Sequence, residues 1–228
     1  PLQRQRIFLM RHRVLISCLQ LQATIDRYRH IFEERDIEIE LPEVVQQLKE
    51  QELLDIIGRF DGVIAGDDEF TAKVLAEGHK LKTVARWGVG VDSVDLEAAQ
   101  RLGIKVTNTP GVFSDEVADV VIGYVILLAR GLHQLDRSVR EGGWAKIQGT
   151  SLRGKVLGVI GFGGIGQAVA YRGAACGMSV LANDTTGIAD RVLCKTGAQA
   201  ADFESLLQES DFISLNCNLT AKSRGMLN

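Results

Sequence analysis

The hydrophobic pattern of the chain predicts short buried strands that alternate with helices. Compact apolar runs are typical of parallel strands that are covered on both faces. In the first half of the sequence such runs predict strands over residues 13–18, 37–41, 62–65, 81–86 and 105–108. Apolar residues at helical spacing predict helices between them, over residues 24–35, 46–57, 71–77 and 94–102. This alternation predicts a parallel sheet with helices on both faces.

A longer apolar helix is expected over residues 114–131. Ser114 is expected at its N-cap and Gly131 at its C-terminal cap. The ten residues between Asp119 and Arg130 carry no charge. A membrane span needs roughly 20 apolar residues, so this run predicts a buried helix and no membrane association. A second series follows, with strands predicted over 155–161, 179–184 and 211–217 and helices over 167–176 and 202–209.

Composition and charge exclude several classes of protein. With 26 basic and 29 acidic residues, the formal net charge is −3, so nothing indicates the basic face of a nucleic-acid binder. The four cysteines form no CxxC pair, and we expect no metal site and no redox dithiol. Residues 11–13 (RHR) interrupt the apolar N-terminal run, and no small-residue cleavage site follows. We therefore expect a cytoplasmic protein rather than a secreted one.

The strongest chemical signal is the glycine-rich segment GFGGIG at residues 161–166. It follows a predicted strand and opens a predicted helix, which is the context of a dinucleotide-binding turn. Gly161 permits the tight turn, and Gly163 has no side chain to block a pyrophosphate. Gly166 lets the helix pack closely on the strand. A glycine-rich turn that binds nothing is the alternative.

The charge at the end of the next strand favours NAD as the cofactor. The backbone N–H groups of Gly164 and Ile165, at a helix N-terminus, are suited to receive the pyrophosphate charge. Asp184 ends the next predicted strand and is placed to accept hydrogen bonds from the ribose hydroxyls of adenosine. Its negative charge would repel a 2′-phosphate, and no Arg or Lys follows until Arg191. We therefore expect NAD rather than NADP.

A second glycine-rich turn, GVGVD at residues 88–92, follows another predicted strand. Its successive N–H groups are suited to hold a small anion such as a carboxylate. A simple turn between a strand and a helix is the alternative that the residues leave open.

Residues 81–228 resemble the D-isomer-specific 2-hydroxyacid dehydrogenases. The resemblance rests on ARWGVGVDSVDLEAAQRLGIKVTNTP (85–110), EVADVVIGYVILLAR (116–130), LRGKVLGVIGFGGIG (152–166) and SDFISLNCNLTAKSRGMLN (210–228). The first of these segments is most similar to phosphoglycerate dehydrogenase. Residues 1–80 fit the family more loosely, as the first part of its substrate domain.

The resemblance implies an α/β fold of two doubly wound parallel-sheet domains. A flavodoxin-like substrate-binding domain is expected over residues 1–112 and a Rossmann NAD-binding domain, incomplete at its end, over 113–228. In this reading, backbone groups of Val89 and Gly90 hold the substrate carboxylate, and Val89 also lies near the nicotinamide end of NAD. Gly161, Gly163, Gly164, Ile165, Gly166, Asp184 and Cys217 match positions around the cofactor. The helix at 116–130 and the arm after it resemble a dimerisation region, so we expect a homodimer built around 116–148.

The sequence departs from the family pattern at several positions. The family has Arg or another long residue where this chain has Gly164, and Glu where it has Asp119. The family signature His-x-Pro-Leu-Thr reads NCNLT at residues 216–220. Loss of the proline puts the shape of that loop in doubt, and Cys217 is a weaker hydrogen-bonding group than threonine.

No catalytic residue is assigned in this chain. The family's catalytic Arg, Glu and His follow the segment that matches residues 210–228, beyond Asn228. The resemblance implies an NAD-dependent oxidoreductase acting on the CH–OH group of a 2-hydroxyacid or on the matching 2-oxoacid. The 228-residue chain itself is expected to be inactive, because proton transfer would lack its base. The alternative is a non-catalytic NAD-binding sensor or corepressor-like protein on the same fold.

Overall fold

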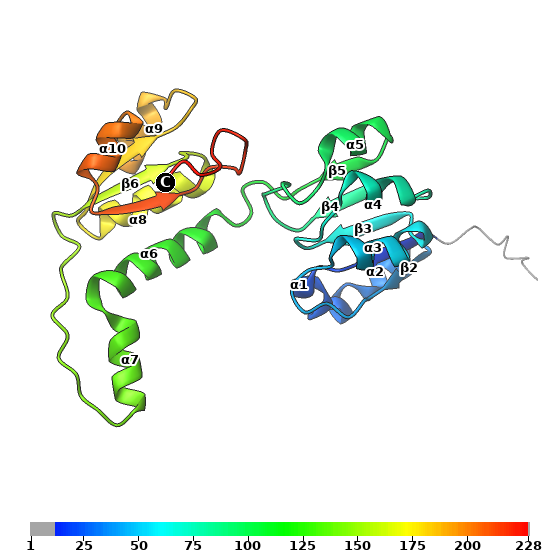
Figure 1. Ribbon diagram of the computed structural model, residues 1–228, viewed down its shortest axis with the longest axis horizontal. Coiled ribbons are helices and arrows are strands. Elements are labelled where there is room, and N and C mark those ends of the chain that lie inside the picture. The colour runs from blue at the N-terminus through cyan, green and yellow to red at the C-terminus, as the bar shows by residue number, and fades with distance from the viewer. Residues whose placement is uncertain (1–11, 228) are drawn as a thin grey trace, which may run out of the picture. The chain divides into compact units, whose positions relative to one another are not determined.

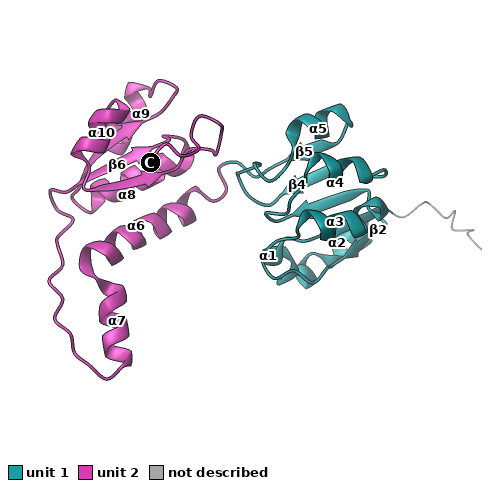
Figure 2. Ribbon diagram, in the orientation of Figure 1, with its two compact units in different colours: residues 1–110 teal, residues 111–228 magenta. Residues whose placement is uncertain are grey.

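The computed structural model describes residues 12–227, which belong to two compact units (Figure 2). The first unit covers residues 1–110 and the second covers residues 111–228. The boundary expected at residue 112 is close to this division. Each unit has its own parallel sheet and its own hydrophobic core. The two units are therefore described separately.

The first unit has a five-stranded parallel sheet in the order β2-β1-β3-β4-β5 (Figure 1). This is the flavodoxin-like order of a doubly wound fold, as the sequence analysis expects. The strands lie close to the predicted ranges: β1 (His12–Ile16), β2 (Ile37–Glu40), β3 (Gly62–Ala65), β4 (Thr83–Arg86) and β5 (Lys105–Thr107). Its helices are α1 (Leu19–Gln22), α2 (Arg29–Glu33), α3 (Glu50–Ile56), α4 (Ala72–Glu77) and α5 (Leu96–Arg101), with 3-10 turns η1 (Ile25–Arg27) and η2 (Ile57–Arg59).

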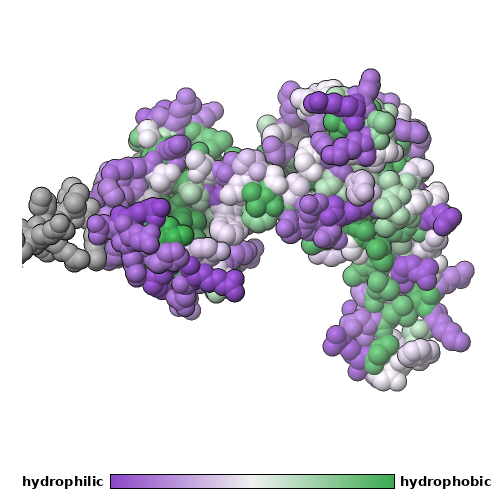
Figure 3. Space-filling model, turned by 180° about the vertical axis from the view of Figure 1, so that it is seen from behind, coloured by the Kyte–Doolittle hydropathy of each residue, from purple (hydrophilic) through white to green (hydrophobic). Residues whose placement is uncertain are grey.

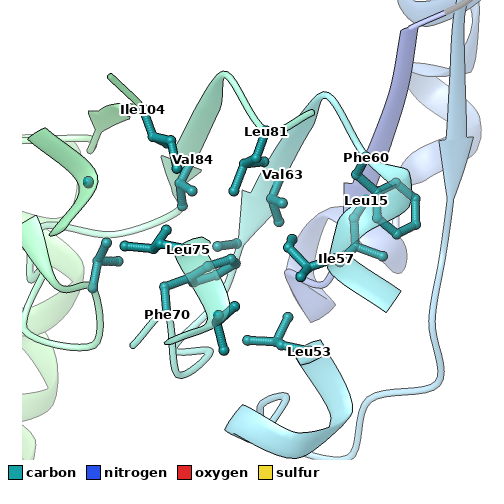
Figure 4. Close-up of a cluster of buried hydrophobic side chains, with 14 of the residues drawn as sticks. Leu15, Leu53, Ile57, Phe60, Val63, Phe70, Leu75, Leu81, Val84 and Ile104 are labelled. Atoms are coloured by element: carbon teal, nitrogen blue, oxygen red, sulfur yellow. The ribbon is translucent and has the colours of Figure 1, made fainter. Parts of the chain in front are cut away.

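Helices cover both faces of this sheet. Leu15 and Val63 point into the larger core, which residues of α3, α4 and α5 complete (Figure 4). The next residue along β1, Ile16, belongs to a second cluster with Leu21 of α1 and Ile25 of η1. Because successive strand residues point to opposite faces, the two clusters lie on opposite sides of the sheet.

Two helix predictions in this unit are wrong in detail. The helix expected over residues 24–35 is divided into η1 and α2, and α1 ends before it begins. The hydroxyl of Thr24 bonds the carbonyl oxygen of Gln20 at 3.0 Å, which competes with a continuous helical ladder. The helix expected from residue 46 begins at Glu50 instead. The carboxylate of buried Asp68 accepts the amide of Leu48 at 2.7 Å, which holds the preceding residues in a loop.

The second unit has a four-stranded parallel sheet in the order β8-β7-β6-β9. In chain order within this unit it reads 3-2-1-4, the first four positions of the Rossmann order 3-2-1-4-5-6. The strands are β6 (Val156–Ile160), β7 (Ser179–Asn183), β8 (Ala198–Ala200) and β9 (Phe212–Leu215). The helices are α6 (Ser114–Arg130), α7 (Leu132–Arg140), α8 (Gly164–Ala175), α9 (Asp190–Thr196) and α10 (Phe203–Glu209).

The helices of the second unit also cover both faces of its sheet. Leu157 and Val159 of β6 share a core with residues of α6 and α8. Gly158, between them, faces α10, where an added Cβ would lie 2.6 Å from Leu206. An ion-paired arginine joins α6 to α8: Arg172 donates to Asp119 at 2.6 Å and lies 3.0 Å from Asp115.

Three elements of this unit were not predicted. Helix α7 replaces the arm expected after Gly131, and α9 and β8 occupy a segment with no predicted structure. Gly131, with φ +62°, ends α6 as expected and allows α7 to begin at once. Ser114 is not the N-cap of α6. That position belongs to Phe113, and Ser114 is the first helical residue. Among residues 12–227, no helix combines the length and the apolar character that a membrane crossing requires.

Candidate functional site

The glycine turn after β6 is closed by contacts that allow no side chain at two of its positions. Gly161 has φ +87°, and a Cβ there would lie 2.5 Å from the amide nitrogen of Cys217. A Cβ at Gly166 would lie 2.1 Å from the carbonyl oxygen of Gly161. The first glycine therefore brings β6 against the end of β9, and the last brings α8 against β6. Both are structural requirements of the turn, as its spacing predicts.

Gly163 is a different case, because a Cβ there would meet no atom within 4 Å. It is the N-cap of α8 and makes no side-chain cap, so the first N–H groups of the helix, at Gly164 and Ile165, have no partner within the helix. The side chain of Gln167 donates to the carbonyl oxygen of Phe162 at 3.0 Å, which turns that carbonyl toward the helix. The result is an open helix N-terminus of the kind that binds anions.

Asp184, which directly follows β7, is held by its neighbours. One carboxylate oxygen accepts the amide of Phe162 at 2.6 Å, and the other accepts both the amide and the hydroxyl of Thr186 at 2.9 Å. Partial burial acts to raise the pKa of Asp184, but these hydrogen bonds outweigh it and hold the pKa below its usual value. The carboxylate is thus ionised at neutral pH. The backbone of Thr185 also acts to lower this pKa, and the Asp184 side chain remains partly exposed, so a ribose hydroxyl can reach it.

A cavity of about 630 Å³ joins these features. It lies at the carboxyl ends of β6 and β9, where the strand order of the sheet reverses, and this is where open α/β sheets bind ligands. Its lining residues come from the ends of β6, β7 and β9 and from the segment after β9: Ile160, Gly161, Gly163, Asn183, Asp184, Thr185, Asn216, Cys217, Asn218, Thr220, Ala221, Lys222, Ser223 and Met226.

Much of this lining was not anticipated from the sequence. Cys217 is a lining residue that the sequence did predict, and its sulfur lies 3.9 Å from the sulfur of Met226. No residue of the segment 218–226 was assigned to the site, although most of that segment lines the cavity. The signal that would have found them is positional, because they follow the strand next to the glycine turn. Gly164 and Ile165 do not line the cavity, although they directly follow Gly163, which does.

Val89 and Gly90 lie in the first unit, in the turn after β4. Thr109 fixes the backbone of Gly88 by two hydrogen bonds. The hydroxyl of Thr109 accepts the amide of Gly88 at 3.0 Å, and the amide of Thr109 donates to the carbonyl of Gly88 at 2.9 Å. The side chain of Asn108 donates to the carbonyl of Val89 at 2.7 Å. The N–H groups of Val89 and Gly90 have no acceptor among the described residues. They are therefore available to a ligand.

Two charged groups flank this turn. The partly buried guanidinium of Arg86 donates to the carbonyl of Trp87 and to Asp67. A carboxylate oxygen of Asp92 would lie 2.9 Å from a Cβ at Gly90. A carboxylate ligand at Gly90 would therefore have a like charge nearby.

None of the four histidines lines the cavity. His12 lies at the start of β1, with its ring 3.3 Å from Asp61. His79 lies 3.8 Å from Glu77, in the loop after α4. His30 and His133 are exposed on helices α2 and α7. Within residues 12–227, no group of three or more His, Cys, Asp or Glu side chains is arranged to hold a metal ion.

Comparison with known proteins gives one family. Residues 122–228, within the second unit, match the family model described as D-isomer specific 2-hydroxyacid dehydrogenase, NAD binding domain. A hydroxypyruvate reductase of Thermotoga maritima is 38% identical over 192 residues, which are 83% of this chain and 61% of that protein. The human D-3-phosphoglycerate dehydrogenase is also 38% identical, over 186 residues that cover 80% of this chain and 35% of that protein. The chain thus spans less than two thirds of the length of these relatives.

Solved structures agree with this result. The apo-structure of D-lactate dehydrogenase from Escherichia coli has a TM-score of 0.75 and 30% identity, and the match covers 95% of this chain and 68% of that one. The Aquifex aeolicus D-lactate dehydrogenase complexed with NAD and lactic acid has a TM-score of 0.80 and 26% identity, over 95% of this chain and 64% of that one. The glycine turn, the free helix N-terminus and Asp184 suit NAD, which is the cofactor of this domain. The chain belongs to the D-isomer-specific 2-hydroxyacid dehydrogenase family.

Proposed function

We propose that this chain provides the cofactor site and part of the substrate site of an NAD-dependent oxidoreductase acting on the CH–OH group of a small 2-hydroxyacid, or on the matching 2-oxoacid. The observation that carries this is the cavity of about 630 Å³ at the strand-order reversal, bounded by Gly163 and Asp184. When bound, NAD supplies the hydride chemistry. The residues of the chain bind and orient it.

In this proposal the amides of Gly164 and Ile165 receive the pyrophosphate, and Asp184 accepts a ribose hydroxyl. Cys217 lies along the cofactor where β9 ends. The carboxylate of Asp184 selects NAD over NADP by charge, because a 2′-phosphate would come next to an ionised acid. The relevant contrast is Asp184→Asn, which keeps the shape and removes the charge.

Calorimetric titration of both cofactors tests this role. Loss of a charged acceptor costs about 1.5–3 kcal/mol, so NAD should bind about ten-fold or more weakly to Asp184→Asn. NADP should bind no worse than before. Asp202→Asn, which removes the carboxylate that caps α10, is the matched control and should change neither affinity. Equal losses for the two cofactors would exclude Asp184 as the selecting residue.

We assign the substrate carboxylate to the free N–H groups of Val89 and Gly90. The bonds from Thr109 and Asn108 support this, because they fix the carbonyls of the turn and leave those two amides open. NMR titration with glyoxylate should shift the amide signals of Val89 and Gly90 first. Asn108→Ala, which frees the carbonyl of Val89, should weaken that response. Shifts confined to other parts of the first unit would contradict the assignment.

The chain by itself should bind without turnover. The histidines lie outside the cavity, so none of them is placed there to move the hydroxyl proton, and general acid–base catalysis contributes about 10²–10⁴-fold. With NADH and hydroxypyruvate or glyoxylate, the absorbance of NADH should fall no faster than in buffer. Turnover at ordinary rates would show that a proton carrier is present, and His79 and His133 would be the first residues to replace.

We further propose that the chain forms a homodimer through one face of α6 and α7. Helix α6 buries Ala118, Ile122, Val125 and Ala129 against its own unit, yet a second apolar stripe remains exposed: Val117, Val120, Tyr124 and Leu128. Figure 3 shows hydrophobic residues gathered over this part of the molecule. A helix that is apolar on both sides needs a second surface to pack against. Sedimentation should give a dimer, and Tyr124→Glu should give a monomer; a monomeric parent at micromolar concentration would refute this.

A further inference from the structure

The loops at the carboxyl end of the first sheet carry an excess of acidic side chains. These loops follow β1 to β5, and one of them contains the turn at 88–92 to which we assign the substrate carboxylate. Only one lysine lies in them, Lys49, while Arg86 is the last residue of β4. The same loops contain six acidic residues: Glu43, Asp67, Asp68, Glu69, Asp92 and Asp95.

Both of these basic side chains are already paired with an acid. The ammonium group of Lys49 donates to Glu69, with 2.9 Å between nitrogen and oxygen. The guanidinium of Arg86 donates to the carboxylate of Asp67. A second anionic group on a ligand would therefore find no unpaired cation in the described loops at this edge of the sheet.

The pair between Arg86 and Asp67 should persist when a ligand binds. The Arg86 side chain is only 10% exposed, and its buried Nε atom has no hydrogen-bond partner among residues 12–227. Without Asp67, this largely buried charge would keep its bond to the carbonyl of Trp87 but lose its counterion, which is costly. The Asp67 side chain is itself 72% exposed, so its negative charge remains accessible from solvent.

This ion pair lies directly against the turn. A Cβ at Gly88 would lie 2.6 Å from Nη1 of Arg86, and Asp92 approaches the other end of the turn at Gly90. The N–H groups of Val89 and Gly90 can hold one carboxylate. A second anionic group on the same ligand would enter surroundings in which exposed carboxylates outnumber the one guanidinium.

We propose, building on the proposed function, that Asp67 restricts the substrate to 2-hydroxyacids and 2-oxoacids with a single acidic group, such as glycerate. Acids that carry a second anion, such as a phosphate ester, are rejected. A phosphate group carries about −1.5 to −2 charges at neutral pH, so a nearby carboxylate repels it strongly. Asp67 also occupies the guanidinium with which a phosphate would otherwise form a charge-assisted bond. It is thus a specificity-determining residue.

Two ligands that differ only in the phosphate test this role. NMR titrations that follow the amides of Val89 and Gly90 give the dissociation constants of D-glycerate and D-3-phosphoglycerate for the full chain. We expect the parent to bind D-glycerate at least about ten-fold more tightly. Asp67→Asn, which keeps an oxygen that can accept from Arg86, should reduce this preference about ten-fold. Asp67→Glu, which keeps the charge, should leave the preference within about two-fold of the parent.

Asp55→Asn is the matched control, because Asp55 is an exposed aspartate on α3, outside these loops. It should change neither dissociation constant. The role of Asp67 is refuted if the parent binds both ligands equally well, or if Asp67→Asn leaves the preference unchanged; the proposed function would survive either result, because D-glycerate would still shift Val89 and Gly90. If D-glycerate does not shift these two amides, the substrate site itself is wrong and the role of Asp67 is refuted with it.

Discussion

Two neighbouring glycines of the cofactor turn should respond in opposite ways to a single methyl group. At Gly161, alanine must adopt φ +87° and place its Cβ 2.5 Å from the amide nitrogen of Cys217. The left-handed backbone costs about 1–2 kcal/mol and overpacking about 1–3 kcal/mol. The obstacle is backbone, and it cannot move freely because Asn216 donates its amide to Ile160 at 2.7 Å. Gly161→Ala should therefore destabilise the second unit by about 2–5 kcal/mol.

At Gly163 the same methyl group meets no atom within 4 Å, and φ is −71°. Alanine is a poorer N-cap than glycine, but it also has fewer unfolded conformations to lose, and these effects oppose each other. The free energy of unfolding should stay within about 1 kcal/mol of the parent value. NAD binding should nevertheless fall sharply, because the methyl group would enter the cavity where the pyrophosphate is expected.

Urea unfolding followed by circular dichroism gives the stability of each variant, and calorimetric titration gives its NAD affinity. Gly187→Ala is the matched control, because it adds the same methyl group to open space in the same unit, at a residue that does not line the cavity. It should change neither quantity. The reasoning fails if Gly163→Ala unfolds as early as Gly161→Ala, or if it binds NAD as well as the parent chain.

Three further predictions concern pH, an ion pair and an exposed strand. Although partial burial acts to raise it, hydrogen bonds lower the pKa of Asp184 in the folded chain. The contribution of Asp184 to stability is therefore complete above its unfolded pKa of about 3.9, and it is lost as the pH falls through the folded pKa. When the free energy of unfolding is measured at decreasing pH, Asp184→Asn should lose less of it than the parent chain. Arg172→Gln breaks the pair with the exposed carboxylates of α6 and should cost about 0.5–1 kcal/mol in urea unfolding, and less at high salt; a cost that salt does not change would contradict the electrostatic account. Strand β9 is at the edge of the sheet, with Ile213 and Leu215 exposed, and such an edge can pair with another chain. Ile213→Lys should therefore reduce light scattering at high protein concentration without lowering the urea midpoint of unfolding. Unchanged scattering would show that aggregation begins at another surface.

Most of the strands could be predicted because they are compact apolar runs, and the turn could be predicted because its glycines have fixed spacing. Helix α7 could not be predicted with the same means. It has no fully buried residue, and its exposed Val139 gave no core-facing stripe to recognise. Strand β8, three residues long, has only Ala198 buried, so its pairing with β7 carries almost no sequence signal.

The residues of the candidate site also fall into two groups, those that the sequence could predict and those that it could not. Gly161, Gly163, Gly166 and Asp184 could be placed because their spacing reflects local backbone geometry. The lining from residues 218–226 depends on contacts between segments far apart in the chain. Such contacts have no local pattern. The error at Ser114 has the same origin, because a serine before a helix is as suited to face a neighbouring helix, here at Gly164, as to cap its own.

The hydrogen bonds of Asp184 have a consequence for the rate at which the cofactor associates. Its carboxylate connects the turn after β6, through Phe162, to the turn after β7, through Thr186, and the protein makes these bonds by itself. The two walls of the cavity are therefore held at a fixed separation, and no slow closing step is needed before contact. In stopped-flow mixing, NAD should associate in one phase whose rate increases linearly with concentration, without the plateau that a preceding rearrangement would impose. Differences in affinity between related ligands should then be expressed almost entirely in how fast each one leaves.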